Sequence, residues 1–299
     1  MKVAAPGKLF TTGAFAVLRG APAVVLAVDR FVYASHGGTP STRPEVLAVA
    51  RRRGAVAPAV DVGGLEIDGR KLGLGGSAAA AVAAAGLLLS EKGPIDAAEV
   101  LEVAFAAHRE VQPRGSGADV AAATFGGVVV VHRHGDRLDA RPAQLPPGLV
   151  WRAYALPRSA RTSDALDRLA ERATHPAVRR ALLRLVGAAH GGAEAVDSRD
   201  LPQFLAAAAE HVAGLGSLGE ALDLPLVPPE IARACDVLHD SGIDSVLLPS
   251  GAGGGDIALF LSSRPPTGHE EATLEALGLQ PLSLGVAPRG VHLVEQGAH

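Results

Sequence analysis

The sequence predicts a mixed α/β (α+β) protein of two domains, and three observations lead to this prediction. Its 299 residues suffice for two domains, because a domain usually takes roughly 100–200 residues. Runs of β-branched residues alternate along the chain with Ala-rich segments of helical periodicity. Near the C-terminus, the expected order of strands and helices is compatible with the split β-α-β arrangement of ferredoxin-like domains.

Regular segments can be placed along the whole chain. The N-terminal part is expected to contain, in order, two strands around a turn (1–35), a helix (45–53), a weak strand (60–68), an Ala-rich helix to residue 91, a second helix (96–111), a short helical turn and a strand (128–134). The C-terminal part is expected to contain a strand (149–156), helices (163–172, 176–190, 201–213 and 229–241), two strands around a glycine loop (243–248 and 257–262), a helix (269–277) and short strands (282–286 and 291–294). Two prolines and a glycine at 144–148 mark a boundary, so we expect domains of residues 1–147 and 148–299.

Hydropathy excludes several classes of protein. Hydrophobic residues make up 48% of the chain and the mean hydropathy is +0.23, so a substantial core is expected and wholesale disorder is excluded. The longest apolar run, residues 78–89, is well short of the ~20 residues of a membrane span. The N-terminus lacks an apolar segment with a cleavage site, so secretion is not expected. We therefore expect a cytoplasmic protein without a membrane partner.

Charge and cysteine content narrow the classes further. A formal net charge of −3 argues against binding nucleic acid by neutralisation of its phosphates. The single cysteine, Cys235, rules out an internal disulfide framework and a cysteine metal cluster. Only four of the 28 basic residues are lysine, and two of them, Lys8 and Lys71, occur in glycine-containing segments where a compact charge could meet a phosphate. The alternative is that both are ordinary surface residues.

The first segment with chemical character is Gly73-Leu74-Gly75-Gly76-Ser77-Ala78, which opens the Ala-rich helix. Its glycines let the backbone approach a ligand closely, and Ser77 is expected to cap the helix. The first N–H groups of a helix have no partner within it, and together with the helix dipole they form a site for an anion. We therefore predict phosphate binding here, the alternative being a tight turn that only starts a helix.

Two other nucleotide motifs compete with this interpretation. The segment also fits the G-x-G-x-x-A dinucleotide pattern, which requires a hydrophobic strand directly before the first glycine and an acidic residue about 20 positions later. Here the preceding segment is Asp68-Gly69-Arg70-Lys71, and the Ala-rich helix leads into another helix, so the dinucleotide interpretation is weak. The P-loop pattern GxxxxGK[ST] does not occur, which excludes a P-loop nucleotidase.

Two further glycine segments have a similar character. Arg114-Gly115-Ser116-Gly117-Ala118-Asp119 lies between two helical patterns, where Asp119 either caps a helix, contributing about 1 kcal/mol, or acts as a positioned base. The segment by itself favours the cap. Pro249 to Asp256, between two expected strands, has four glycines in five positions, which costs chain entropy unless the backbone makes room for something. It is either a flexible hairpin or a loop ordered around an anion.

Together these segments resemble the motifs of the GHMP kinase superfamily, and within it those of phosphomevalonate kinases. Residues 5–9 with 13–18 resemble the first motif, and residues 69–79 resemble the phosphate loop. Residues 108–127 are the part most similar to phosphomevalonate kinases, and residues 249–256 resemble the third motif. The four motifs occur in family order from residue 4 to residue 260, so the resemblance covers most of the chain.

The resemblance implies an N-terminal α/β domain, a C-terminal ferredoxin-like domain and an active site in the cleft between them. It implies that ATP phosphates lie over residues 73–78 with Mg²⁺ near Ser77, and that Lys8 and Asp119 act at the nucleophile. The acceptor of phosphomevalonate kinases carries a carboxylate and a phosphate, so cations and small hydroxyl groups are expected near it. The residues expected to contact the acceptor are Lys71, Arg114, Ser116, Gly117, Arg158 or Arg161, Ser159, Thr162 and, in the third motif, Ser250, Gly251 and Ala252.

The sequence also departs from the family pattern. Ala14 replaces the glutamate of the first motif, Leu248 replaces the lysine before the third motif, and Pro113 replaces a glycine. The phosphate loop has one serine, Ser77, instead of a pair. His108 occupies about the place of a metal-binding glutamate of mevalonate kinases, which disfavours mevalonate as the acceptor.

The predicted function is therefore the ATP-dependent phosphorylation of phosphomevalonate to diphosphomevalonate, in the mevalonate route to isoprenoids. Phosphoryl transfer depends mainly on positioning and on charge neutralisation, and a phosphate-monoester acceptor is already largely ionised near pH 7. Two alternatives remain: a kinase of the same family that acts on mevalonate or a sugar phosphate, and a non-catalytic protein on the same fold that binds a small molecule. The partner is expected to be a small molecule, and the protein a monomer or homodimer.

Overall fold

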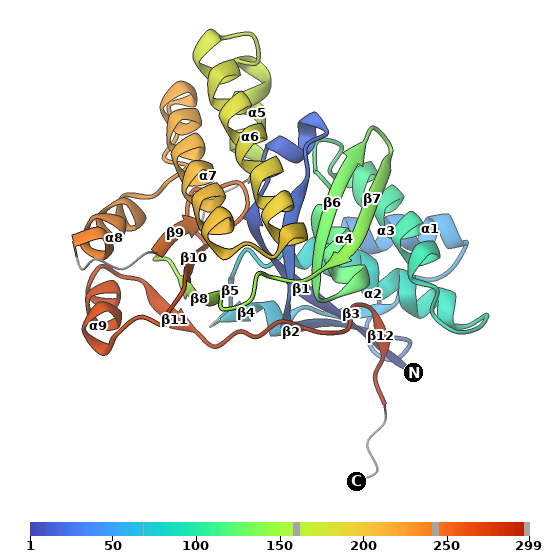
Figure 1. Ribbon diagram of the computed structural model, residues 1–299. Coiled ribbons are helices and arrows are strands. Elements are labelled where there is room, and N and C mark those ends of the chain that lie inside the picture. The colour runs from blue at the N-terminus through green and yellow to red at the C-terminus, as the bar shows by residue number, and fades with distance from the viewer. Residues whose placement is uncertain (68, 158–161, 241–244, 296–299) are drawn as a thin grey trace. The chain divides into compact units, whose positions relative to one another are not determined.

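The computed structural model describes residues 1–67, 69–157, 162–240 and 245–295. The chain forms two compact units, and each unit combines segments that are distant in the sequence (Figure 1). The first unit comprises Met1–Leu9, Val25–Pro142 and Gly285–His299, and the second comprises Phe10–Val24 and Ala143–Leu284. The domain boundary expected between residues 147 and 148 remains a prediction.

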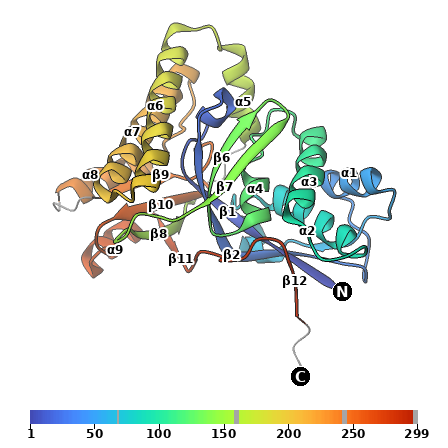
Figure 2. The same ribbon diagram turned by 45° about the vertical axis from the view of Figure 1, so that its right-hand side comes forward.

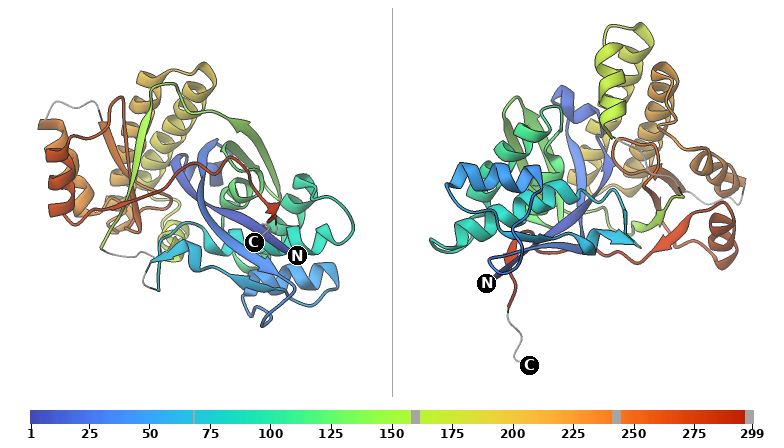
Figure 3. Two further views of the ribbon diagram at one scale, coloured as in Figure 1. Left: turned by 90° about the horizontal axis from the view of Figure 1, so that it is seen from below. Right: turned by 180° about the vertical axis from the view of Figure 1, so that it is seen from behind.

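The larger sheet contains the two expected N-terminal strands and the valine-rich strand. Its order is β12-β1-β2-β6-β7, with β3 paired to β2. The strands are β1 (Lys2–Thr12), β2 (Ala23–Ser35), β3 (Ala59–Asp61), β6 (Val128–His134), β7 (Arg137–Ala143) and β12 (His292–Leu293). Strand β12 brings the end of the chain beside its beginning, with Leu293 opposite Val3 and His292 opposite Ala4 (Figure 3).

The helices of the first unit are grouped around the Ala-rich helix. They are α1 (Pro44–Arg53), α2 (Gly76–Ser90), α3 (Ala97–Val111) and α4 (Ala118–Phe125). Helix α2 contacts α1, α3 and α4, and the residues from Ala78 to Ala85 are fully buried. Alanine lets neighbouring helices approach closely, so this apolar run forms the central helix of the group.

The C-terminal segment is attached to the first unit by backbone hydrogen bonds. Gly127 donates its N–H to the carbonyl of Ala287, and Ala287 donates to Ala27, at 2.7 and 2.9 Å. A Cβ atom on Gly126, where φ is +72°, would lie 2.3 Å from the backbone of the segment, and one on Gly290 would lie 2.0 Å from the Thr124 carbonyl. Gly126 and Gly290 are therefore required by this close approach.

The smaller sheet belongs to the second unit and confirms the expected ferredoxin-like arrangement. Its strands are β8 (Val150–Ala155), β9 (Ser245–Pro249), β10 (Ile257–Ser262) and β11 (Gln280–Leu282), with the helices α8 (Pro229–Asp240) and α9 (Gly268–Ala276) between them in the chain. The antiparallel order is β11-β8-β10-β9. Leu238 of α8 and Leu274 of α9 share a core with Tyr154 and Phe260 of the sheet. The last expected strand of this sheet, at 282–286, is observed earlier, at β11.

Three more helices complete the second unit: α5 (Thr162–Glu171), α6 (Pro176–Ser198) and α7 (Leu201–Leu222). Helices α6 and α7 pack side by side along their length (Figure 2) and extend well beyond the expected 176–190 and 201–213. The expected ends, residues 190 and 213, lie directly before Gly191 and Gly214. The glycines lie instead at the helix contact, where a Cβ on Gly214 would be 2.8 Å from Leu185 and one on Gly191 would be 3.5 Å from Ala207. Close packing outweighs the low helix propensity of glycine here.

The buried His211 of α7 predicts a pH dependence of stability. Burial lowers the pKa of His211 from 6.5 to about 4, so the ring is neutral in the folded protein near pH 6. The unfolded chain takes up this proton below about pH 6.5, and the folded chain does not, so stability is lost as the pH falls towards 4. The loss should approach about 3 kcal/mol, and His211→Leu should remove it. Urea denaturation at pH 7 and pH 4.5 measures the difference.

The exposed His190 of α6 offers a control, because His190→Gln should leave the pH dependence of wild type unchanged. If His211→Leu retains the full loss of stability between the two pH values, the buried ring is not its source.

Candidate active site

The loop that opens α2 has a left-handed backbone at two glycines. Gly73 has φ +67° and Gly75 has φ +79°, and Gly75 is the N-cap of α2. No side chain caps this helix, so the expectation that Ser77 is the cap was wrong: Ser77 is the second residue of the first turn. Because no side chain covers the helix start, its first N–H groups and the positive end of its dipole are directed towards the loop. This geometry is suited to an anion.

Lys8 of β1 is joined to this loop. Its side chain is 8% exposed, and its Nζ donates to the Gly73 carbonyl at 3.0 Å. The backbone N–H of Lys8 donates to the Leu74 carbonyl at 2.9 Å. A Cβ on Gly75 would lie 3.0 and 3.1 Å from Cγ and Cε of Lys8. The missing side chain of Gly75 therefore makes room for the lysine.

Asp119 lies on the other side of the same glycine. A Cβ on Gly75 would be 3.6 Å from Cβ of Asp119. Asp119 is the second residue of α4, after the N-cap Gly117, and its side chain is 23% exposed. Its Oδ1 accepts a hydrogen bond from the N–H of Val120 at 3.0 Å. The cap interpretation therefore does not describe Asp119, whose carboxylate lies within the first turn, partly open to solvent.

His108 of α3 is a neighbour of Asp119 that the sequence analysis treated only as a replaced glutamate. The ring is buried, and its Nε2 lies 4.0 Å from Oδ1 of Asp119. Its Nδ1 is also buried and has no hydrogen-bond partner among the described residues. The glycine Gly115 lies over the ring, where a Cβ would be 3.3 Å from Nε2. The ring therefore bounds the space in which the Asp119 carboxylate can move.

The remaining residues of the second motif shape the start of α4. The Ser116 hydroxyl accepts from the N–H of Ala118 at 3.3 Å, and Arg133 of β6 donates to the carbonyl of Gly115. A Cβ on Gly117, where φ is +77°, would overlap the ring of Phe105. Arg114 is exposed in the loop before them. Ser116 and Gly117 thus have structural roles here, and their predicted contact with the acceptor remains a prediction, as does that of Arg114.

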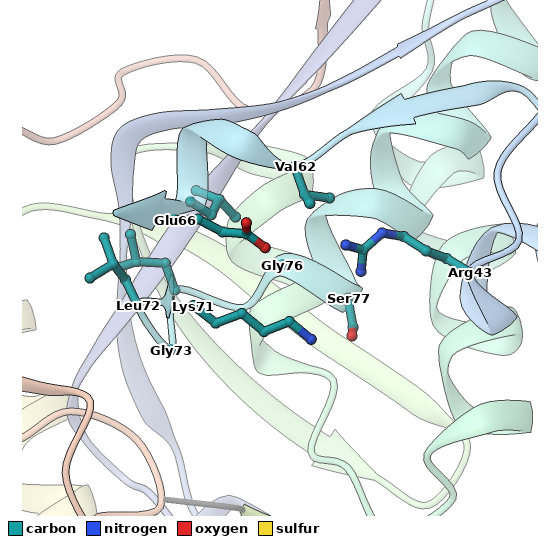
Figure 4. A pocket seen from close by; sticks show the side chains of 10 residues that line it. Arg43, Val62, Glu66, Lys71, Leu72, Gly73, Gly76 and Ser77 are labelled. Atoms are coloured by element: carbon teal, nitrogen blue, oxygen red, sulfur yellow. The ribbon is translucent and has the colours of Figure 1, made fainter. Parts of the chain in front are cut away.

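A small pocket of about 100 Å³ adjoins the phosphate loop. It is lined by Arg43, Val62, Leu65, Glu66, Lys71, Leu72, Gly73, Leu74, Gly76 and Ser77. Lys71 comes from β5 (Arg70–Lys71), which pairs with β4 (Glu66–Ile67), and Arg43 directly precedes α1. In Figure 4 the side chains of Lys71 and Arg43 extend from opposite sides towards the hydroxyl of Ser77.

The structure thus brings Lys71 to the phosphate loop, and it adds two residues that the sequence analysis missed. Arg43 carried no signal, because arginine is the common basic residue of this chain and position 43 lies in an irregular segment. Glu66 belonged to a weak strand with no motif. Apart from Arg43, the lining residues lie between positions 62 and 77, so Arg43 is the residue that folding brings to the pocket from a distance.

The third motif lies in the second unit, as the connection between β9 and β10. Four of its glycines have positive φ, from +80° to +125°, and Gly254 donates to the carbonyl of Leu226 at 2.9 Å. The Ser250 hydroxyl accepts from the N–H of Phe10 at 2.9 Å and donates to its carbonyl at 3.3 Å. These bonds order the loop. Contact of Ser250, Gly251 and Ala252 with a substrate remains a prediction.

Some predicted acceptor contacts fall outside the described residues, namely Arg158, Ser159 and Arg161. Thr162 begins α5, and its predicted role remains a prediction.

The residues at the loop are compatible with Mg²⁺ that is bound mainly by a nucleotide. Among the described residues, no three or more His, Cys, Asp or Glu side chains are grouped as a metal site. Mg²⁺ is commonly held by one or two carboxylates together with substrate phosphates and water. The Ser77 hydroxyl lines the pocket and the Asp119 carboxylate is partly exposed, so these two side chains supply oxygen atoms of the required kind.

Comparison with known families agrees with this geometry. The family described as the GHMP kinases N terminal domain matches residues 46–127, which include the phosphate loop and Asp119. The fold matches that of GHMP kinases across nearly the whole chain. Residues 46–127 therefore match a GHMP kinase N-terminal domain, and the chain is similar to members of that superfamily along nearly its whole length. This similarity supports the coarser interpretation as an ATP-dependent small-molecule kinase of the GHMP type.

Individual relatives differ in their acceptors. Phosphomevalonate kinase of Streptomyces sp. (strain CL190) is 27% identical, over 96% of this chain and 97% of that protein. Mevalonate kinase of Archaeoglobus fulgidus is also 27% identical, over 89% of this chain and 94% of that protein. The structure of Streptococcus pneumoniae phosphomevalonate kinase in complex with phosphomevalonate and AMPPNP has a TM-score of 0.77 at 18% identity, covering 96% of this chain and 99% of that one.

In the described parts of the chain, no helix combines the length and hydrophobicity needed to cross a bilayer. The expected cytoplasmic location remains a prediction.

The close contact at Gly75 predicts a loss of nucleotide binding in Gly75→Val. A side chain there would press on Lys8 and would also occupy a left-handed backbone position that β-branched residues avoid. We expect ATP affinity to fall by at least about ten-fold, which corresponds to about 1.4 kcal/mol. Titration calorimetry measures the affinity.

Thermal unfolding of Gly75→Val should stay cooperative, which separates loss of the site from loss of the fold. Gly69→Val is a matched control, because Gly69 also has positive φ, +75°, but has open space where the Cβ would be placed. Unchanged ATP affinity in Gly75→Val would contradict the proposed position of the phosphates.

Proposed function

We propose that this kinase transfers the γ-phosphoryl group of ATP to phosphomevalonate. The observation that carries the proposal is the convergence of Lys8 and Asp119 on Gly75, at the start of α2. A cation and a carboxylate that both lie within van der Waals reach of the position a Cβ would take on Gly75, at an uncapped helix start, are the groups that phosphoryl transfer requires. In this proposal the α2 start binds phosphates of ATP, and the chemistry takes place beside Gly75.

Lys8 and Asp119 have different roles in the proposed reaction. The buried Lys8 ammonium stabilises negative charge that develops on the transferring group, and its bond to the Gly73 carbonyl holds it in place. Asp119 orients the acceptor oxygen, and the Val120 N–H and the His108 ring limit its movement. Mg²⁺, with Ser77 among its proposed ligands, would neutralise phosphate charge and align the nucleotide.

Phosphomevalonate fits the proposed chemistry because its acceptor oxygen belongs to a phosphate monoester. Such an oxygen is largely ionised near pH 7, since the second phosphate pKa is about 6. The main barrier is then the repulsion between two anions, which positive charge must offset. Lys8 and the exposed Arg114, six residues after His108 in the second motif, are candidates to supply this charge.

Mevalonate is the second candidate acceptor. It is supported by the relative from Archaeoglobus fulgidus, whose identity to this chain equals that of the Streptomyces relative. His108 in place of the family's metal-binding glutamate argues against it. Both acceptors use the same groups at Gly75, so the choice depends on the residues that surround the acceptor.

Replacement of Asp119 tests the proposed role in phosphoryl transfer. Asp119→Asn keeps the shape of the side chain and removes its charge, so kcat should fall by about 100-fold or more while KM for ATP changes little. Asp136→Asn, which changes an exposed carboxylate of the same unit, should have nearly wild-type kcat. If kcat of Asp119→Asn stays within a few-fold of wild type, Asp119 does not act on the transferred group.

Acceptor specificity is tested by ADP release with mevalonate, phosphomevalonate, diphosphomevalonate and sugar phosphates. Phosphomevalonate should be the preferred acceptor, and mevalonate should be much poorer because it lacks the phosphate. Arg114→Ala should raise KM for phosphomevalonate by roughly ten-fold, since a charge-assisted bond to phosphate contributes about 1.5–3 kcal/mol. KM for ATP should not change.

Arg137→Ala removes another exposed arginine of the first unit and serves as the control. Equal turnover of mevalonate and phosphomevalonate would reject the proposed acceptor, and an unchanged acceptor KM in Arg114→Ala would reject its cation site.

A further inference from the structure

The pocket beside the phosphate loop concentrates positive charge that the proposed transfer step does not use. Arg43 and Lys71 reach it from two elements that are 28 residues apart in the chain, and both point towards Ser77 (Figure 4). The first turn of α2, which carries Ser77, adds the positive end of a helix dipole. Three sources of positive potential therefore face one small volume.

These charges have few internal partners. Within the described parts of the chain, no hydrogen bond or ion pair is formed by the side chain of Arg43 or of Lys71. Glu66 is the one acidic residue that lines the pocket, and it is the cross-strand neighbour of Lys71 in the β4–β5 hairpin. The arrangement brings like charges together, which disfavours the empty pocket and favours an anion within it.

The backbone that carries Arg43 is held in place. Its N–H donates to the hydroxyl of Ser41 at 3.3 Å, and its carbonyl accepts from the N–H of Leu47 at 3.0 Å in the first turn of α1. Pro44 follows and keeps Arg43 in an extended conformation, with φ −64° and ψ 129°. The half-buried guanidinium group is therefore presented from a restrained position, which lowers the entropy that binding would cost.

We propose that Arg43 binds the phosphate chain of the nucleotide, and that Arg43 and Lys71 clamp this chain against the start of α2. The inference rests on the proposed function, which it deepens by adding a residue that no motif contains. The planar guanidinium group offers paired donors for two phosphate oxygens, whereas the lysine acts as a point charge. Lys71, expected from the sequence to contact the acceptor, serves the nucleotide in this arrangement.

The proposed clamp recognises the phosphate chain of the nucleotide and not the nucleoside. A site that binds mainly through the phosphate chain should bind inorganic tripolyphosphate without the nucleoside. Loss of Arg43 should weaken tripolyphosphate and ATP by the same factor, because the lost contact is to phosphate in both. A role in shaping the nucleoside part of the pocket would weaken ATP alone.

The experiment is titration calorimetry of the full chain with ATP and with tripolyphosphate, each in the presence of Mg²⁺. Arg43→Gln and Lys71→Gln should each weaken both ligands by about ten-fold, and KM for the acceptor should stay within two-fold of wild type. Arg43→Lys keeps the positive charge and removes the paired donors of the guanidinium group. Its affinity for both ligands should lie between those of Arg43→Gln and wild type.

Two control variants match the two positions. Arg52→Gln removes an arginine of α1 that pairs with Glu110, and Arg70→Gln removes the strand neighbour of Lys71, whose side chain leaves β5 on the opposite face. Both should bind ATP and tripolyphosphate like wild type. Unfolding curves verify that each variant is folded.

The outcomes separate this inference from the proposed function. The clamp is rejected, and the kinase proposal stands, if wild type binds ATP and Arg43→Gln binds ATP and tripolyphosphate as tightly as wild type does. The same conclusion follows if Arg43→Gln loses affinity for ATP but not for tripolyphosphate. If the folded wild type binds neither ATP nor tripolyphosphate, the proposed function itself fails. If Lys71→Gln raises KM for the acceptor and leaves ATP affinity unchanged, Lys71 contacts the acceptor and not the nucleotide, and the clamp is rejected.

Discussion

The close contact between β1 and the loop that opens α2 is the constraint on which the candidate site depends. Lys8 can lie against this loop only because Gly75 has no side chain, and its amine is held by a carbonyl of the same loop. The left-handed backbone of Gly75 also ends the loop and starts the helix. One residue therefore determines the direction of the helix dipole, the room for the cation and the distance to the carboxylate on α4.

The surrounding structure supports this contact through small residues at close approaches. Alanines along α2 allow three other helices to pack around it, and so hold the helix start in position. After α4, Gly126 and Gly290 let the C-terminal segment cross against the backbone, which secures the helix that carries Asp119. Rigid packing of this kind favours a site whose groups are already placed before a ligand arrives.

The parts of the site that were predictable are those that depend on neighbouring residues in the chain. The glycines of residues 73–76 predicted a loop that opens a helix, and the structure has one. The same approach failed for Ser77, because a cap depends on where the helix begins, and Gly75 takes that position. It also ended α6 and α7 too early, because helix propensity alone does not register that a glycine lies at a tight helix contact.

The fold class, the ferredoxin-like order of the last strands and helices, and the segments that carry Lys8, the phosphate loop and Asp119 could be read from the amino-acid sequence alone. These follow from periodicity, glycine positions and motif order along the chain. Folding was needed to show that Lys8 bonds to Gly73, 65 residues away, that His108 lies beside Asp119, and that Arg43 joins Lys71 at one pocket. Such distances are set by the packing of α1 to α4 against one another. For a side chain on an irregular segment, such as Arg43, no sequence pattern indicates which residues it will contact.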